Sequence, residues 1–123
     1  MLMRMASAVA LAAAVWSGAA LAQDAKDGEG LFKRVCFTCH TAEAGKNKLG
    51  PSLFGVVGRK AGAAPGFKYS DAMEKSGITW DEAALDKYLA DPKAAVPGNK
   101  MAYAGVKKPE ERKALIAYLN SLR

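Results

Sequence analysis

All of the cysteine and histidine in this sequence lies in one five-residue segment. Cys36 and Cys39 are three positions apart, and His40 follows directly. The Cys-x-x-Cys-His spacing is typical of a c-type haem attachment site. Each thiol would form a thioether to one vinyl group of the haem, and the imidazole of the adjacent histidine would bind the iron. The segment therefore predicts one covalently bound haem c.

A Cys-x-x-Cys pair has two other common uses. A redox dithiol needs no adjacent histidine. A structural zinc site has four protein ligands, whereas the two cysteines and one histidine supply at most three. The sequence therefore favours haem attachment and keeps the dithiol and the zinc site as alternatives.

The second axial ligand of such a haem would have to be a residue other than histidine. Outside the first 22 residues the sequence has two methionines, Met73 and Met101, besides lysines and tyrosines. Met73 falls in a short predicted helix, where packing is the simpler interpretation. Met101 ends the loop segment 97–101, and we expect it to be the ligand. Ligation by His and Met raises the haem potential, and a saturated iron favours electron transfer over oxygen binding.

The N-terminus resembles a secretory leader. Met1–Arg4 is basic, residues 5–21 are apolar and rich in alanine, and Ala20–Ala22 is an A-x-A cleavage motif. The alternative is an uncleaved anchor, because a run of about 17 residues is at the lower limit for spanning a bilayer. We expect residues 1–22 to be a cleaved signal peptide and 23–123 to be one domain. Export and covalent haem both indicate a bacterial periplasm.

The elements that would position the motif are helices joined by loops rich in glycine and proline. We find no convincing strand alternation, so the predicted class is all-α: three main helices with short helices and loops around the haem. The expected loop covers residues 41–67. The expected helices are about 24–35, a short one from a Ser70 cap to about 76, one opened by a Thr79 capping box and ending at 90 or 91, a turn at 92–95, and one from Pro109.

The net charge of +6 could indicate a nucleic-acid partner. The sequence has no nucleic-acid-binding motif, and export argues against such a partner. We therefore interpret the charge as a surface for acidic protein partners, and we expect a monomer.

The sequence resembles the soluble class I cytochromes c of the mitochondrial and purple-bacterial short-chain type. The resemblance runs from about residue 27 to 122. It begins with Gly28 and Phe32, continues through the haem motif, and is carried by seven further blocks in the same order: Gly50–Leu53, Gly58–Lys60, Gly66–Ala72, Gly77–Trp80, Tyr88–Lys93, Pro97–Met101 and Leu115–Leu119.

The resemblance implies a small single-haem fold and a role for each matching residue. It assigns Cys36 and Cys39 to the thioethers and His40 and Met101 to the iron. It also implies three further roles: a Pro51 carbonyl that accepts from the His40 imidazole, propionate donors at Arg59, Tyr69 and Trp80, and a phenol at Tyr88 near the methionine sulfur. Two positions depart from the usual residues, Met73 where Asn is usual and Asn99 where Thr is usual. We expect a rearranged internal polar network.

The resemblance also implies an electron carrier that is not an enzyme. Its partners would be membrane complexes: a quinol–cytochrome c oxidoreductase as donor, and an oxidase or photosynthetic reaction centre as acceptor. Alternatives are a dedicated donor to one periplasmic oxidoreductase, and a haem peroxidase or gas-binding protein with an open iron site. The docking lysines implied at the haem edge are Lys33, Lys48, Lys93, Lys100, Lys107 and Lys108.

Overall fold

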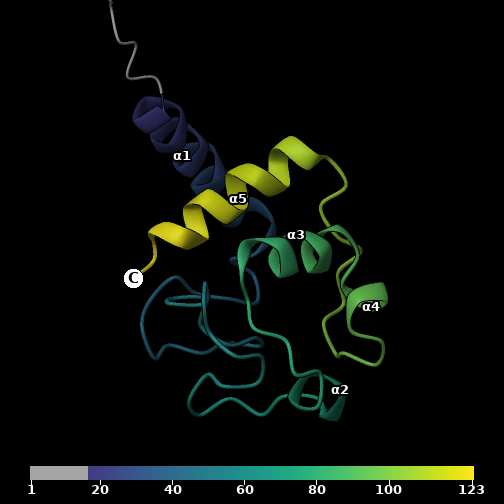
Figure 1. Cartoon of the computed structure of the whole chain (residues 1–123). Helices are drawn as coiled ribbons and strands as arrows, with labels where there is room; N and C mark the ends of the chain where they lie inside the picture. Colours follow the sequence, from purple (N-terminus) through teal and green to yellow (C-terminus); the bar gives the residue numbers. More distant parts are fainter. Residues whose placement is uncertain (1–16) are drawn as a thin grey trace, which may run out of the picture.

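The computed structural model describes residues 17–123, so most of the predicted signal peptide lies outside the described residues. The described range folds into helices and loops (Figure 1). Its only β pairing is an isolated bridge between Lys60 and Thr79, which confirms the all-α prediction. The helices are α1 (Ser17–Val35), α2 (Asp71–Glu74), α3 (Glu82–Ala90), α4 (Pro92–Ala95) and α5 (Pro109–Ser121).

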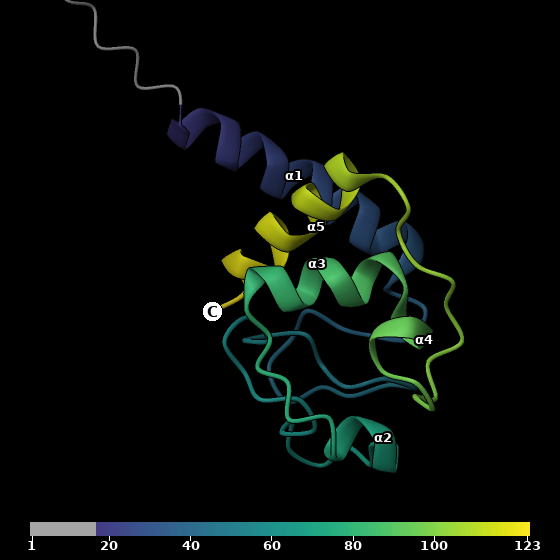
Figure 2. The same cartoon turned by 45° about the vertical axis from the view of Figure 1, so that its right-hand side comes forward.

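The crossing of α1 and α5 forms the main helical contact, and both views show it above the long loop (Figures 1 and 2). Gly28 lets the two backbones approach closely, because a Cβ there would lie only 2.0 Å from the Ala114 carbonyl oxygen. Phe32 and Leu115 are each 1% exposed, and the rings of Phe32 and Tyr118 lie 5.4 Å apart. This crossing anchors the end of α1 from which the cysteine motif continues.

The start of α1 differs from the prediction. The helix already includes Ser17, the first described residue, and not only residues from about Asp24, because the intervening residues are mostly alanine and leucine, which are strong helix formers. It therefore runs through the predicted cleavage boundary after Ala22. Within the described part of the chain, no helix is both long and apolar enough to cross a membrane.

The start of α3 also differs from the prediction. Asp81, and not Thr79, is the N-cap, and its carboxylate accepts from the Ala84 N–H at 2.7 Å. Thr79 does not begin a helix because the backbone around it is extended. It forms an antiparallel bridge with Lys60, and the Trp80 N–H donates to the Arg59 carbonyl. The helix ends at Ala90, before Pro92.

The other predicted elements are present with small shifts. The segment between the haem motif and α2 has no helix, in agreement with the predicted loop. The Ser70 hydroxyl caps α2 by accepting from the Met73 N–H at 3.1 Å, although α2 ends at Glu74 and not near 76. Both α4 and α5 begin at a proline, as predicted.

Candidate haem site

The cysteine motif follows α1 as a run of tight turns. The Cys36 N–H donates to the Phe32 carbonyl at 2.9 Å, and the His40 N–H donates to the Cys36 carbonyl, also at 2.9 Å. The Cys39 N–H donates to that same carbonyl at 3.1 Å. The backbone therefore holds both cysteines and the histidine within one turn at the end of α1.

The His40 ring is held from two sides. Its Nδ1 lies 2.8 Å from the Pro51 carbonyl oxygen. Because a carbonyl only accepts, Nδ1 carries the proton and Nε2 keeps its lone pair. Gly50 packs directly on the ring, since a Cβ there would lie 2.3 Å from His40 Cε1. This arrangement is what an imidazole ligand to iron requires.

The pKa of His40 is lowered, mainly by burial. The bond to Pro51 opposes this shift, and the charge of Lys48 adds to it. The imidazole is therefore neutral at neutral pH, as metal ligation demands.

The two cysteines are free thiols and half-buried. Burial, with a smaller effect of Cys39, raises the pKa of Cys36 to about 11. A redox dithiol works through a thiolate of lowered pKa, so the raised value disfavours that alternative. Residues 17–123 also contain no group of three or more His, Cys, Asp or Glu side chains placed to hold a metal ion.

Met101 lies in the loop after α4 and meets a residue of α3. The Tyr88 hydroxyl donates to Met101 Sδ across 3.9 Å. Burial raises the pKa of Tyr88 to about 12, so the hydroxyl keeps its proton and remains a donor. The Tyr88 ring packs on Trp80 with centroids 4.8 Å apart. The structure thus brings together three of the residues singled out in the sequence.

Arg59 and Trp80 are brought together by backbone pairing. The Trp80 N–H donates to the Arg59 carbonyl at 2.9 Å, and the Gly58 N–H donates to the Trp80 carbonyl at 2.7 Å. The Arg59 guanidinium donates to the carbonyls of Ser52 and Phe54 at 3.0 and 3.3 Å, but its Nε is buried without a partner. A buried donor without an acceptor is rare, so this Nε–H is available to donate to a bound group.

Tyr69 has a local partner of its own. Its hydroxyl oxygen accepts from the Ala64 N–H at 3.0 Å, which leaves the O–H proton free to donate. Its ring packs edge-on against Phe67 with centroids 4.9 Å apart. The hydroxyl therefore holds the loop and still has a donor available.

These residues together fit a haem c. Cys36 and Cys39 supply the two thiols, and His40 supplies a neutral imidazole. Met101 supplies a soft thioether, and the unpaired Nε of Arg59 supplies a buried donor for a propionate. Each donor matches a group of the cofactor, including the propionate charge, which needs compensation when buried.

Two asparagines support the site, and little in the sequence indicates either of them. The Asn47 amide accepts from the Ser52 N–H at 2.9 Å and donates to the Pro65 carbonyl at 3.0 Å, which braces the loop after Pro51. The Asn99 amide oxygen accepts from the Met101 N–H at 2.9 Å. Asn47 has no sequence signal beyond the preference of asparagine for loops, and Asn99 stands out only as a departure from the family pattern.

The predicted docking lysines fall into two groups. Lys107 donates to the carbonyls of Ala90 and Ala104 at 2.8 and 2.7 Å. Lys48 donates to the Phe37 carbonyl and lies 4.0 Å from the centroid of that ring. These two stabilise the fold locally. The remaining four are exposed and have at most one exposed side-chain contact each: Lys33, Lys93, Lys100 and Lys108.

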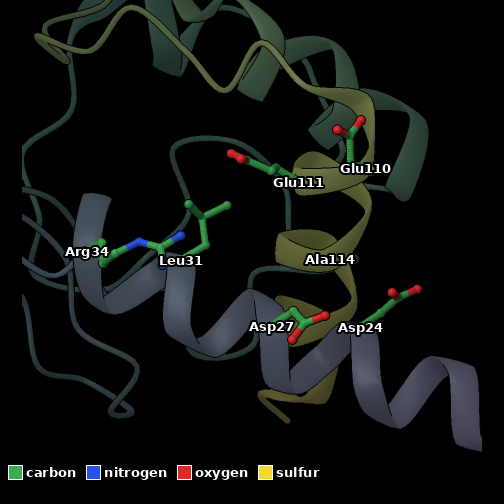
Figure 3. Close-up of a pocket in the computed structure, with 7 residues that line it drawn as sticks. All are labelled: Asp24, Asp27, Leu31, Arg34, Glu110, Glu111 and Ala114. Carbon is green, nitrogen blue, oxygen red and sulfur yellow. The ribbon is translucent and has the colours of Figure 1, made fainter.

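An open cleft of about 250 Å³ between α1 and α5 contains none of the predicted site residues (Figure 3). It is lined by four carboxylates, Asp24, Asp27, Glu110 and Glu111, with Arg34 at one end. This acidic face is opposite in sign to the exposed lysines Lys33, Lys93, Lys100 and Lys108.

Comparison with known proteins decides the family. The model of the family described as cytochrome c matches residues 25–123. The chain belongs to the cytochrome c family. It is 61% identical over 89 residues to cytochrome c2 iso-2 of Magnetospirillum molischianum, covering 72% of this chain and 92% of that protein. It is 54% identical over 110 residues to cytochrome c2 of Rhodomicrobium vannielii, covering 88% and 87%.

A solved structure agrees. Cytochrome cH from Methylobacterium extorquens superposes with a TM-score of 0.76 at 50% identity, covering 80% of this chain and 98% of that one. Cytochromes c bind one covalently attached haem c and are electron carriers, not enzymes. The predictions of family, fold class and cofactor are confirmed, and this chain is a single-haem electron carrier.

Proposed function

We propose that the chain is a periplasmic electron carrier in which Cys36 and Cys39 attach the haem and His40 and Met101 are its axial ligands. The observation that carries this proposal is the contact of 3.9 Å between the Tyr88 hydroxyl and Met101 Sδ. The contact holds a soft thioether in a half-buried loop. The other proposed ligand is the imidazole of His40, which the Pro51 carbonyl orients.

When bound, the haem supplies the Fe(II)/Fe(III) couple that accepts and releases one electron. The chain's own residues keep the geometry the same in both states. The His40 ring is fixed by the Pro51 carbonyl and by Gly50, so it cannot rotate freely. The unpaired Nε of Arg59 would donate to a propionate, with Tyr69 and Trp80 as further donors. A donor set that changes little between the two states suits electron transfer.

Substitution of Met101 tests the ligand set. The ferric form of the native protein should show a Met–iron charge-transfer band, and Met101→Ala should lose it and bind an added small ligand such as cyanide more readily. The matched control is Met73→Leu, because Met73 is buried in the hydrophobic core and leucine keeps its volume. A band that survives in Met101→Ala would refute the assignment.

We also propose that residues 1–22 are removed on export and that the mature domain is 23–123. Removal would shorten α1 by residues 17–22 and leave its crossing with α5 at Gly28 intact. The N-terminus of the purified periplasmic protein tests this boundary. A start at Gln23 is expected, whereas a retained leader would favour the membrane anchor.

The proposed partners are membrane complexes with acidic docking surfaces. They are a quinol–cytochrome c oxidoreductase as donor and an oxidase or photosynthetic reaction centre as acceptor. The exposed lysines, including Lys93, Lys100 and Lys108, support this choice. Electron-transfer rates with such complexes should fall as salt rises, because exposed charges are screened.

A charge-reversal pair tests the docking surface. Lys100→Glu should slow electron transfer several-fold, whereas Lys113→Glu is the control, because Lys113 lies beside Asp24 on the acidic face. Equal slowing by both would contradict a defined docking surface. Activity with only one soluble periplasmic oxidoreductase would instead favour a dedicated donor.

A further inference from the structure

We propose that Asn99 is a positioning residue that fixes the Met101 thioether relative to α3. The inference rests on the proposed ligation by Met101 and adds a residue to it. Asn99 is 7% exposed, and it is one of the few buried polar side chains among the described residues. A buried amide must be hydrogen-bonded to be tolerated, so its partners show what it holds.

The Asn99 amide bonds three backbone groups at once. Its Nδ2 donates to the Pro92 and Val96 carbonyls, both at 2.8 Å. Its Oδ1 accepts from the Met101 N–H at 2.9 Å. The amide orientation is unambiguous, because the opposite one would place an oxygen against two carbonyls and an NH2 against an N–H.

These bonds connect the methionine loop to a helix. Pro92 opens α4 and Val96 caps its C-terminus, so the amide bonds both ends of that helical turn. The turn is itself joined to α3 through Asp91, whose backbone N–H donates to the Lys87 carbonyl of α3 and whose side chain caps α4. Through these contacts, the Met101 backbone is connected to α3, the same helix that carries Tyr88.

No other natural side chain of similar size reproduces these three bonds. An aspartate keeps an acceptor for the Met101 N–H but turns repelling oxygens toward the Pro92 and Val96 carbonyls. A threonine has one hydroxyl, which cannot donate to both carbonyls and also accept from the amide. Alanine removes all three bonds. The series Asn99→Asp, Asn99→Thr and Asn99→Ala therefore separates anchoring of the loop from simple packing.

Asn47 provides a matched control on the other side of the site. Its amide also donates to a proline carbonyl, that of Pro65, and accepts from a backbone N–H, that of Ser52. It braces the loop that carries Pro51, which bonds His40. Asn47→Ala removes the same kinds of bonds without touching the methionine loop.

The experiment compares the holoproteins during heating. One measurement follows the Met–iron charge-transfer band of the ferric form, and the other follows helix content by circular dichroism. In the Asn99 variants the band should disappear at a lower temperature than the helices. In the native protein and in Asn47→Ala the band and the helices should be lost at temperatures closer to each other than in the Asn99 variants. Asn99→Thr, whose hydroxyl can still make part of these bonds, should show the same separation to a smaller degree and guards against an unfolded variant.

Two further readouts sharpen the test. Amide exchange at Met101 in the ferrous protein should accelerate about tenfold in Asn99→Ala, because one hydrogen bond to that N–H is lost. The reduction potential should fall in the Asn99 variants, because a weaker thioether bond favours the ferric state.

Two results would overturn the inference. Loss of band and helices together in all Asn99 variants, with an unchanged potential, would reduce Asn99 to a structural residue while the ligation by Met101 stands. A native protein without the band would overturn both this inference and the ligand assignment.

Discussion

His40 and Met101 lie in loops of different construction. The His40 loop is built by the backbone: its N–H continues the turns of α1, its ring bonds the Pro51 carbonyl, and Gly50 lies against the ring. The Met101 loop is held by side chains: the Asn99 amide, which belongs to the loop itself, and the Tyr88 hydroxyl of α3. The first loop has little freedom once α1 has formed, whereas the second depends on a few replaceable contacts.

The difference explains how one small domain could hold one proposed axial ligand firmly and the other adjustably. A larger side chain in the His40 loop cannot be accommodated by small local shifts, because the backbone and the ring are already in contact. Changes in the Met101 loop alter single hydrogen bonds, each with a net value of about 1 kcal/mol. We therefore expect large stability effects on the histidine side and redox effects with small stability cost on the methionine side.

The largest effect is expected from Gly50→Ala. The new Cβ would lie 2.3 Å from His40 Cε1, so the loop or the ring must move. Overpacking of this kind costs about 3 kcal/mol of unfolding free energy, and the displaced ring should also reduce the yield of holoprotein. Denaturant unfolding of the holoprotein measures the loss.

Gly30→Ala is the control for that substitution. Gly30 is in α1 with nothing within 4 Å of a new Cβ, so alanine should stabilise the protein by about 1 kcal/mol. If both alanines had the same effect, the claim that Gly50 supports the histidine ring would be wrong.

An intermediate effect is expected from Arg59→Leu, a change outside both loops. The change leaves the Ser52 and Phe54 carbonyls without their donor and removes the buried Nε. The expected loss is about 2 kcal/mol of holoprotein stability, with a shift of the reduction potential as the propionate charge loses its partner. Thermal unfolding and redox titration measure both, and an unchanged potential would argue against a propionate at this site.

The smallest effect on stability is expected from Tyr88→Phe. The hydroxyl lies 3.9 Å from Met101 Sδ, and its removal should cost less than about 1 kcal/mol. A donor to the sulfur withdraws electron density from it, so loss of the donor should strengthen the thioether as a ligand to ferric iron and lower the potential. Tyr118→Phe, at the α1–α5 crossing, is the control and should leave the potential unchanged. A raised potential in Tyr88→Phe would contradict this view of the methionine side.

The sequence predicted the parts of the fold that depend on local patterns. The short helix at Pro92 and the long one at Pro109 follow from proline at the first helical position, and the Ser70 cap follows from its hydroxyl. The start of α3 was predicted wrongly because the capping pattern at Thr79 is local, whereas the conformation of Thr79 is set by a non-local backbone pairing. That residue is held extended by pairing with residues near Lys60, which no local window detects.

The candidate site shows the same division. The identity of the haem motif is local and was evident from Cys36, Cys39 and His40. The contacts that orient the site join residues distant in sequence, such as Arg59 with Trp80 and Tyr88 with Met101, and these needed a family resemblance. The bonds of Asn99 could not be predicted, since they depend on the exact path of the loop around α4.

One measurement tests the central claim most directly: optical spectra of the purified holoprotein, oxidised and reduced, before and after addition of carbon monoxide. A closed His40/Met101 site predicts a c-type reduced spectrum, a Met–iron charge-transfer band in the oxidised form, and no change of the reduced spectrum with carbon monoxide at neutral pH. Absence of the band together with rapid carbon monoxide binding would show an open iron site and contradict the account.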